Sequence, residues 1–425
     1  MMVMLTVKQQ HLEKDGRPFF YLADTAWSAL TNAELSDWEY YLTKRESQGF
    51  NVIQIDLLRQ WDASPVAAKR EPLAVTYTEQ GYVYDYQQLN EDYFARAEKM
   101  IQMVVDHGMV PALVLLWANY VPGTWMKELI HNNPMPFDQL HPYVEAVTRR
   151  FQKYHPLYLV SGDVNFPDDD PKTLGEITRY YTKVLRVLRQ TDPQALATFH
   201  INGESTNLPQ RLLEGADFFA YQSGHGKPGQ DTSFTIPQTM RSRGYTGPII
   251  NLEPCYELMP KFDATIKERF NRADVRKAAW QSLLAGANAG VTYGAHGIWS
   301  WHTVGAPFLY EHPYDWHEAL QAPGADDFSF LKHLAERLNL AELVPQQDDL
   351  GAGVLVAKAG DKTIIYSALA KQVDLGALGL TKDSCHVTLV DLATHNFRHP
   401  IWSVDGRKIE PFGVTEDALL VCTPK

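Results

Sequence analysis

The hydrophobic positions of this chain follow two alternating periods from about residue 19 to residue 340. Short apolar runs, typical of strands buried on both faces, alternate with longer segments whose apolar residues recur at helical spacing. The segment Asp92–His107 is a clear helix of this kind, because its apolar residues form one stripe and Gly108 follows as a stop signal. The pattern therefore predicts alternating strands and helices.

Eight such strand–helix units are predicted. Alternation of this kind implies a parallel sheet with right-handed crossovers, and eight units predict an α/β fold, a (β/α)8 TIM barrel, over residues 1–342. An open doubly wound sheet is disfavoured because no strand-to-helix turn carries a G-x-G-x-x-G or P-loop pattern. The predicted strands are Phe19–Ala23, Asn51–Asp56, Met109–Leu116, Leu157–Ser161, Ala195–His200, Phe218–Tyr221, Pro248–Leu252 and Gly290–Tyr293. The predicted helices are Glu34–Gln48, Asp92–His107, Phe137–Tyr154, Lys172–Arg189, Pro209–Glu214, Thr232–Arg243, Thr265–Ala287 and Phe328–Leu340.

The pattern changes after Pro345. Short apolar or alternating runs, separated by turn residues and without helical period, predict a small antiparallel β-sandwich domain over residues 345–425. Bracing of the barrel is favoured over carbohydrate binding for this domain. Within the barrel, Arg59–Leu89 is predicted to be a long irregular loop, either functional or simply packed on itself.

Composition limits the partners and the location. The net charge is 39 − 51 = −12 and there is no long basic run, which argues against nucleic acid or an anionic membrane as partner. The cysteines Cys255, Cys385 and Cys422 are too far apart to predict a disulfide framework or a structural zinc. Met1–Gln10 lacks the features of a signal peptide, and no apolar run approaches the roughly 18 residues of a membrane span, so a cytoplasmic location is predicted. Nothing in the pattern predicts an oligomeric state.

Two predicted strands end on a carboxylate. The apolar run before Glu253 stops at Pro254, which cannot continue a central strand, and the run before Asp163 has the same form. The carboxyl ends of barrel strands carry the chemistry, so both side chains should face one mouth from opposite walls. The alternative for Glu253 is a helix cap or a partner for an arginine.

A pair of carboxylates is what glycoside hydrolysis requires: one donates a proton to the leaving oxygen and the other attacks the anomeric carbon. A separation of about 5–5.5 Å would give retention of configuration, and one of roughly 6.5–9.5 Å inversion. Placement after strands four and seven favours retention by analogy with other barrel glycosidases. We assign Asp163 as acid/base and Glu253 as nucleophile, partly on the resemblance described below.

Other polar and aromatic residues at strand ends are candidates for binding a sugar substrate. Each also has a structural interpretation: Asp24 could cap the first helix, and the tryptophans could close the barrel. Tyr221 could donate a hydrogen bond to the nucleophile. The candidates are Asp24, Trp27, Trp117, Asn119, His200, Asn202, Tyr221, Gln222, His296, Trp299 and Trp301.

Three further signals favour structural interpretations. The acidic run Asp168–Asp170 is typical of a solvated loop rather than a cation site. The segment His200–Glu204 has metal-ligand residue types without a partner cluster, so it is interpreted as a sugar-binding or structural loop. Cys255 is expected to be a small buried residue, since no base is evident beside it. No metal site is predicted.

Several segments together resemble the apiosidase-like glycoside hydrolases, the family that includes glycoside hydrolase family 140. The resemblance covers about residues 10–340. It implies a barrel of the large retaining-glycosidase clan, with Asp163 as acid/base and Glu253 as nucleophile, and with no cofactor. The wider clan has Asn-Glu after strand four, whereas Gly162-Asp163 here agrees with the apiosidase-like subgroup. The matching segments are Gly16–Trp27, Tyr40–Gln54, Ser161–Asp163, Asn251–Pro254, the helix from Arg276 to Leu284, and Gly294–Trp299.

The leading hypothesis is a retaining glycoside hydrolase that cleaves a terminal sugar from a plant-type oligosaccharide or glycoside. The resemblance suggests an apiose-like, pentose or deoxy sugar. The alternative is a non-catalytic carbohydrate-binding barrel protein. A metal-dependent barrel hydrolase would need clustered His and Asp at several strand ends, which the sequence does not show.

Overall fold

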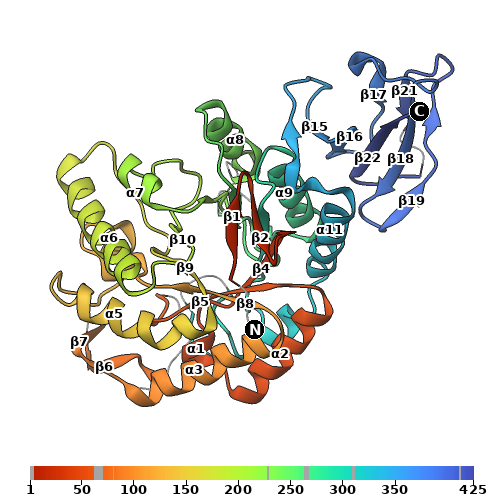
Figure 1. Cartoon of the computed structure of the whole chain (residues 1–425). Helices are drawn as coiled ribbons and strands as arrows, with labels where there is room; N and C mark the ends of the chain where they lie inside the picture. Colours follow the sequence, from red (N-terminus) through yellow and green to blue (C-terminus); the bar gives the residue numbers. More distant parts are fainter. Residues whose placement is uncertain are drawn as a thin grey trace.

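Eight parallel strands form a barrel at the centre of the computed structural model, which describes residues 4–61, 70–79, 81–226, 229–262, 268–308, 312–410 and 413–425 (Figure 1). Neighbours in the sheet follow the order β10-β9-β8-β5-β4-β13-β12-β11, which is chain order around a ring. The predicted (β/α)8 barrel is therefore confirmed. Its strands are β4 (Tyr21–Thr25), β5 (Val52–Asp56), β8 (Val110–Val114), β9 (Leu157–Leu159), β10 (Ala197–Thr198), β11 (Phe219–Gln222), β12 (Ile249–Glu253) and β13 (Gly290–Tyr293).

Side chains help to close the ring between β10 and β11. The Asp217 backbone N–H donates to the Ala197 carbonyl at 2.9 Å, and the Asp217 carboxylate accepts from the Ala197 N–H at 2.6 Å. The Thr198 hydroxyl donates to the Phe218 carbonyl at 2.7 Å. These bonds satisfy edge groups that a regular ladder would otherwise pair.

A helix follows each barrel strand. Each helix buries one apolar stripe against the sheet, as in α3, where Tyr93, Ala97 and Met100 are buried. No helix in the described ranges combines the length and apolar character that crossing a membrane needs. The barrel helices are α2 (Leu35–Ser47), α3 (Glu91–Asp106), α5 (Leu140–Phe151), α6 (Pro171–Thr191), α7 (Gln210–Gly215), α8 (Gly229–Ser242), α9 (Arg272–Leu284) and α11 (Gly324–Leu338); α1 (Ala29–Asn32), α4 (Trp125–Leu129) and α10 (Trp316–Ala319) are short.

The predicted helix Thr265–Ala287 is wrong over the described residues 268–271, which are not helical. The helix begins at Arg272, because Asn271 and Asp274 form a capping box in which each side chain accepts the other's backbone N–H. Before the cap, Arg269 forms a bridge with Pro260 instead of a helical turn. Residues 263–267 lie outside the described ranges.

Two small antiparallel sheets were not predicted. The first, β1 (Thr6–Lys8), β2 (His11–Lys14) and β3 (Arg17–Phe19), precedes the barrel, and its second turn is the Asp15-Gly16 dipeptide with both residues at positive φ. The second pairs β6 (Leu73–Thr78) with β7 (Gly81–Leu89). The irregular-loop prediction is therefore wrong over these two strands, whereas residues 62–69 and 80 lie outside the described ranges. The alternating tyrosines of β7 were the missed signal.

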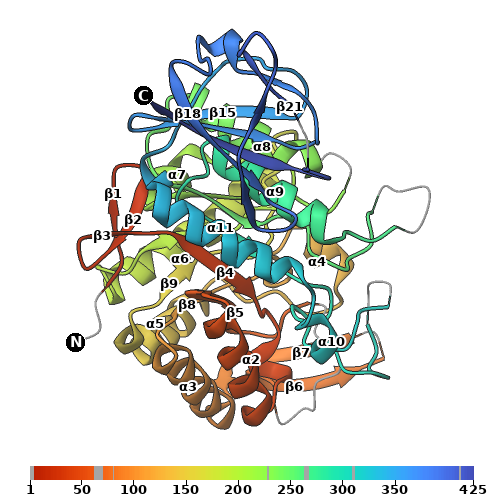
Figure 2. The same cartoon turned by 90° about the vertical axis from the view of Figure 1, so that its right-hand side faces the viewer.

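The C-terminal strands form two antiparallel sheets, which confirms the predicted β-sandwich (Figure 2). Ile365, Leu389 and Leu420 belong to a small core of their own, while Tyr366 packs parallel to Trp280 of α9 at 6.4 Å. The larger sheet is β14 (Val344–Pro345), β15 (Val354–Ala359), β16 (Lys362–Ser367), β22 (Ala418–Pro424), β18 (Cys385–Asp391) and β19 (Asn396–Arg398); the smaller is β17 (Val373–Asp374), β21 (Lys408–Glu410) and β20 (Ile401–Trp402).

One buried arginine joins the barrel to these sheets. Arg276 of α9 is 2% exposed; its Nη1 donates to Asp327 of α11 at 2.9 Å and its Nε to Asp417, just before β22, at 2.9 Å. The Tyr366 hydroxyl also donates to Asp417, at 3.2 Å. A buried charge without its partner is costly, so Asp417 depends strongly on this guanidinium, whereas Asp327 also accepts hydrogen bonds from Arg272 at 2.6 and 2.8 Å.

We expect Arg276→Ala to lower the free energy of unfolding by about 3–5 kcal/mol, because it leaves Asp327 and Asp417 buried with less compensation. Urea denaturation followed by circular dichroism measures this change. Arg149→Ala is the matched control: Arg149 is 64% exposed and pairs with Glu145 one turn away on its own helix, so its expected effect is within about 0.5 kcal/mol. Equal shifts in the two variants would contradict the junction role.

Candidate active site

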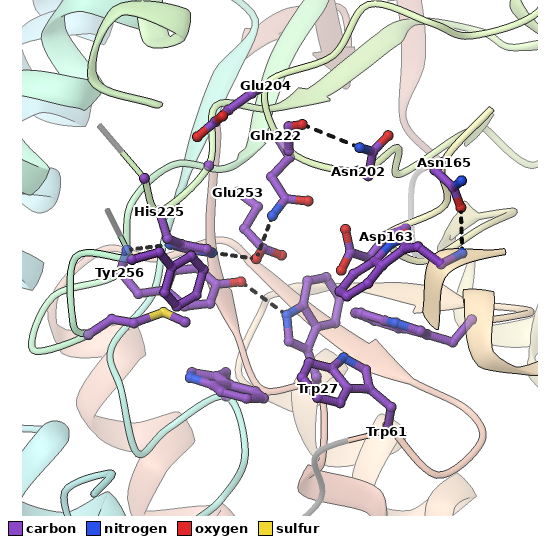
Figure 3. Close-up of a pocket in the computed structure, with 18 of the residues that line it drawn as sticks. Trp27, Trp61, Asp163, Asn165, Asn202, Glu204, Gln222, His225, Glu253 and Tyr256 are labelled. Atoms are coloured by element: carbon purple, nitrogen blue, oxygen red, sulfur yellow. Dashed lines mark hydrogen bonds and ion pairs between the residues drawn. The ribbon is translucent and has the colours of Figure 1, made fainter. Parts of the chain in front are cut away.

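A cavity of about 500 Å³ opens at the carboxyl ends of the barrel strands (Figure 3). Its size is typical of small-molecule sites, which span roughly 300–1,000 Å³. Aromatic side chains and polar groups share its wall, and both Asp163 and Glu253 border it. The lining residues are Trp27, Gln60, Trp61, Trp117, Trp125, Asp163, Asn165, Asn202, Gly203, Glu204, Gln222, Gly224, His225, Gly226, Glu253, Tyr256, Met259, Phe262 and Trp299.

Glu253, the last residue of β12, is held by donors from neighbouring strands. Its Oε1 accepts hydrogen bonds from His225 Nε2 at 2.9 Å and from Gln222 Nε2 at 3.1 Å. His200 Nε2 lies 3.3 Å from Oε2, an electrostatic contact rather than a well-aligned hydrogen bond. Burial alone would raise the pKa of Glu253, but His200 and His225 outweigh burial and lower that pKa below its ordinary value. Glu253 is therefore an ionised carboxylate.

The backbone fixes which nitrogen of each imidazole carries the proton. His225 Nδ1 accepts from the Tyr256 backbone N–H at 3.4 Å, and His200 Nδ1 accepts from the Asp163 backbone N–H at 2.9 Å. In the neutral form, each imidazole must therefore carry its proton on Nε2, which faces Glu253. His200 thus touches both carboxylate residues.

Asp163 lies just beyond β9 in an unusual backbone conformation. Its φ of +50° falls in the left-handed region, which residues other than glycine rarely adopt. Its carbonyl accepts a hydrogen bond from Trp125 Nε1 at 2.9 Å. Burial, and next the charge of Glu253, raise the pKa of Asp163 well above its usual range. Asp163 therefore holds a proton under conditions in which Glu253 is ionised, which divides the acid and base roles.

Packing against Trp117 explains why residue 162 is a glycine. A Cβ at this position would lie 2.3 Å from Cε3 of Trp117, because the indole packs against the glycine backbone. A hydrogen bond joins the segments that follow β8 and β9 at this point: the Ala118 N–H donates to the Gly162 carbonyl at 2.9 Å. A side chain larger than hydrogen would overlap this indole, so the packing of Trp117 accounts for the glycine before Asp163.

The tyrosine beside Glu253 is Tyr256, not Tyr221. Burial first, and then the charge of Glu253 and a hydrogen bond to it, raise the pKa of Tyr256 well above its ordinary value. Its hydroxyl also accepts from Trp27 Nε1 at 3.1 Å. The Tyr221 hydroxyl donates instead to the Ser233 carbonyl at 2.8 Å, so the expected bond from Tyr221 to Glu253 is wrong.

The sequence model for the catalytic domain of apiosidase-like proteins matches residues 7–342 of this chain. The chain belongs to the apiosidase-like family. This match spans the whole barrel, including both carboxylates and the cavity around them. No curated protein matches the sequence closely enough to count as a relative.

Solved structures share the fold of this apiosidase-like protein. A glycoside hydrolase family 5 protein from Bacteroides vulgatus is 20% identical with a TM-score of 0.80, over 99% of this chain and 92% of that one. A second structure, described as a glycoside hydrolase, is 21% identical with a TM-score of 0.79, over 99% and 97% of the two chains. Both likenesses extend over the C-terminal sheets as well as the barrel.

The cavity of this family member is bordered by only part of the predicted binding set. Trp27, Trp117, Asn202, Gln222 and Trp299 line it, together with both carboxylates. The other predicted residues lie behind the lining. They are Asp24, Asn119, His200, Tyr221, His296 and Trp301, all buried.

Packing explains why the residues in this second group do not reach the cavity. Asp24 is fully buried, where its carboxylate pairs with Arg45 of α2 and accepts from the Tyr41 hydroxyl at 2.8 Å. Trp301 stacks on Trp316 with ring centroids 4.7 Å apart. Asp24 thus ties β4 to α2 and does not border the cavity.

Several cavity residues were missed in the sequence. His225 follows β11 between two glycines, and its approach to Glu253 depends on the pairing of β11 with β12. Tyr256, Trp61, Trp125 and Asn165 line the cavity from segments after four different strands. The only available signal was the density of aromatic residues in those loops.

The remaining sequence signals have structural roles. The Asp170 carboxylate accepts from the Lys172 and Thr173 N–H groups and so caps α6. Cys255 is buried, and burial raises the pKa of its thiol. Among the described residues, no group of three His, Cys, Asp or Glu side chains is arranged to hold a metal ion.

We expect Gly162→Ala to lower the free energy of unfolding by about 1–3 kcal/mol, because the new methyl group overlaps Trp117. Gly175→Ala in α6 is the matched control: its Cβ meets nothing within 4 Å, so better helix propensity should stabilise the protein by up to about 1 kcal/mol. Denaturant unfolding of both variants measures the difference. A Gly162→Ala protein as stable as wild type would show that the indole is not fixed there.

Proposed function

We propose that this protein is a retaining glycoside hydrolase that releases a terminal sugar by double displacement. The observation that carries the proposal is the asymmetric pair of carboxyl groups on one cavity. Glu253 is kept ionised by imidazole donors, whereas Asp163 is kept protonated by burial and by the charge of Glu253.

In the first step, the Asp163 carboxyl donates its proton to the glycosidic oxygen while a Glu253 oxygen attacks the anomeric carbon. The carbon–oxygen bond to the leaving group breaks, and a glycosyl ester forms on Glu253. In the second step, the Asp163 carboxylate takes a proton from water, which attacks the anomeric carbon. Glu253 leaves as a carboxylate, and both groups return to their starting states.

The groups around Glu253 support the nucleophile role. Gln222 and His225 fix Oε1 by two hydrogen bonds, which limits rotation of the carboxylate before attack. Tyr256 and His200 add neighbouring polar hydrogens. The backbone of Asp163 donates to His200 and accepts from Trp125. Its carboxyl group points toward the cavity, as the role of general acid requires (Figure 3).

The substrate we propose is a glycoside of an apiose-like, pentose or deoxy sugar in a plant-type oligosaccharide. Family membership suggests the sugar class, and a cavity of about 500 Å³ suits a short glycoside better than a long chain threaded through a cleft. We further propose a catalytic domain over residues 1–342 and a domain over residues 345–425 that braces it. The contacts of Arg276 with Asp417 support the bracing role.

Removing either carboxyl group should abolish most activity on a panel of aryl glycosides. We expect Glu253→Ala to reduce kcat/KM at least about 1,000-fold and Asp163→Asn about 100- to 10,000-fold. Azide should rescue Glu253→Ala and yield a glycosyl azide of inverted configuration, which nuclear magnetic resonance identifies. The controls are Glu214→Ala and Asp169→Asn, whose side chains are exposed away from the cavity and should keep wild-type rates.

Wild-type activity in both carboxyl variants would refute the assignment. A wild type that binds glycosides but cleaves none would favour the carbohydrate-binding alternative.

The pH profile of kcat/KM should be bell-shaped. Activity needs ionised Glu253, so the rate falls as pH drops through its lowered pKa; it needs protonated Asp163, so the rate falls as pH rises through its raised pKa. In Asp163→Asn the alkaline limb should disappear. In His225→Ala the acidic limb should move to higher pH, because ionised Glu253 loses a donor. An unmoved acidic limb would contradict the role of His225.

A further inference from the structure

Two tryptophans border the cavity on the side of the proposed acid. Figure 3 shows Trp61 and Asn165 on the Asp163 side, across the cavity from His225 and Tyr256. Trp125 is tied to the same side, because its Nε1 donates to the Asp163 carbonyl at 2.9 Å. The ring centroids of Trp61 and Trp125 are 6.4 Å apart with planes at 70°, so the two indoles form a corner.

These indoles differ from most tryptophans of the chain. Trp27, Trp38, Trp117, Trp280, Trp301 and Trp316 are almost completely buried, whereas Trp61 and Trp125 are partly exposed within the cavity. The polar groups of Trp125 are already used, since its backbone N–H donates to Asn165 Oδ1 at 2.9 Å. What Trp125 offers a ligand is therefore the apolar surface of its ring.

Contacts of Arg59 fix the segment that leads into Trp61. The guanidinium of Arg59, two residues before Trp61, donates to the buried Glu71 carboxylate at 2.7 Å and lies 4.8 Å from the centroid of the Tyr82 ring. The Arg59 carbonyl accepts from the Tyr120 hydroxyl at 2.7 Å. These contacts with Glu71, Tyr82 of β7 and Tyr120 fix the segment next to Trp61, which favours a preformed surface.

We infer that Trp61 and Trp125 form the binding site for the leaving group, and that this group carries a flat ring with an apolar face. The inference rests on the proposed function: the acid protonates the oxygen of the leaving group, so the leaving group lies beside Asp163. A ring stacks on one indole and meets the other at its edge. Both a phenolic ring and a pyranose present such a face.

The test compares leaving groups on one sugar, taken from the aryl glycosides that the wild type cleaves. The substrates are the phenyl glycoside, a disaccharide with a pyranose leaving group, and the hexafluoroisopropyl glycoside, whose leaving group is acidic like phenol but has no ring. We expect Trp61→Ala to lower kcat/KM at least about fivefold more on a ring-bearing substrate than on the hexafluoroisopropyl glycoside. The Asp163 backbone is held by Trp125 and His200, so the Trp61 variant tests ring binding more directly than a Trp125 variant does.

Trp125→Phe and Trp125→Ala separate the two roles of the second indole. The phenylalanine variant keeps a ring but loses the bond to the Asp163 carbonyl, so it should slow all three substrates and shift the alkaline limb of the pH profile. The alanine variant should add a loss confined to ring-bearing substrates. Trp402→Ala, in the C-terminal sheets, is the matched control and should leave the ratios between substrates unchanged.

The outcomes separate this inference from the proposed function. A ring-dependent loss on the phenyl glycoside alone identifies an aromatic leaving group, and one on the disaccharide alone identifies a sugar; either supports the site. Equal losses on all three substrates, with Glu253→Ala inactive, would overturn the leaving-group site and leave the hydrolase assignment standing. A wild type that cleaves no glycoside would overturn both.

Discussion

An ionised carboxylate in a buried position is the constraint on which the cavity depends. Transfer of Glu253 out of water costs several kcal/mol unless donors replace its hydration. Gln222 and His225 from the end of β11, and His200 from the end of β10, supply them. These elements meet only because the barrel brings the carboxyl ends of consecutive strands to one rim. The barrel thus brings together the donors that keep Glu253 ionised although it is buried.

The second carboxyl group is linked to the first through His200. Because its Nδ1 accepts from the backbone of Asp163, its other nitrogen presents a hydrogen to Glu253. One ring therefore fixes the strained backbone of Asp163 and assists the ionisation of Glu253. Gly162 and Trp117 complete the arrangement, since close packing of the indole on the glycine leaves the chain little freedom just before Asp163.

Polar contacts of the same kind hold the molecule together away from the cavity. Asp24 ties β4 to α2 through Arg45, and Asp417 ties the C-terminal sheets to α9 through Arg276. In each case a buried charge has a partner from a distant segment, so the ion pair specifies an arrangement as well as contributing stability. The difference between these carboxylates and the pair at the cavity is access: Asp24 and Asp417 are sealed behind packed side chains, whereas Asp163 and Glu253 border the cavity.

The sequence by itself determined the barrel, the C-terminal sandwich and the two carboxylates at strand ends. Buried parallel strands and amphipathic helices have periods that are local properties, and the run before Glu253 ends at a proline that no central strand accepts. The first residues of helices such as α9 were harder to predict, because the capping box of Asn271 and Asp274 outweighed an apolar pattern that extended further toward the amino end.

Only the tertiary structure decided which strand-end residues face the cavity. Asp24 and Trp27 lie three residues apart, yet one is buried against Arg45 and the other borders the cavity, because loop paths and cross-strand partners set side-chain direction there. His225 joined Glu253 for the same reason: their approach depends on the register of β11 and β12, which no local pattern encodes.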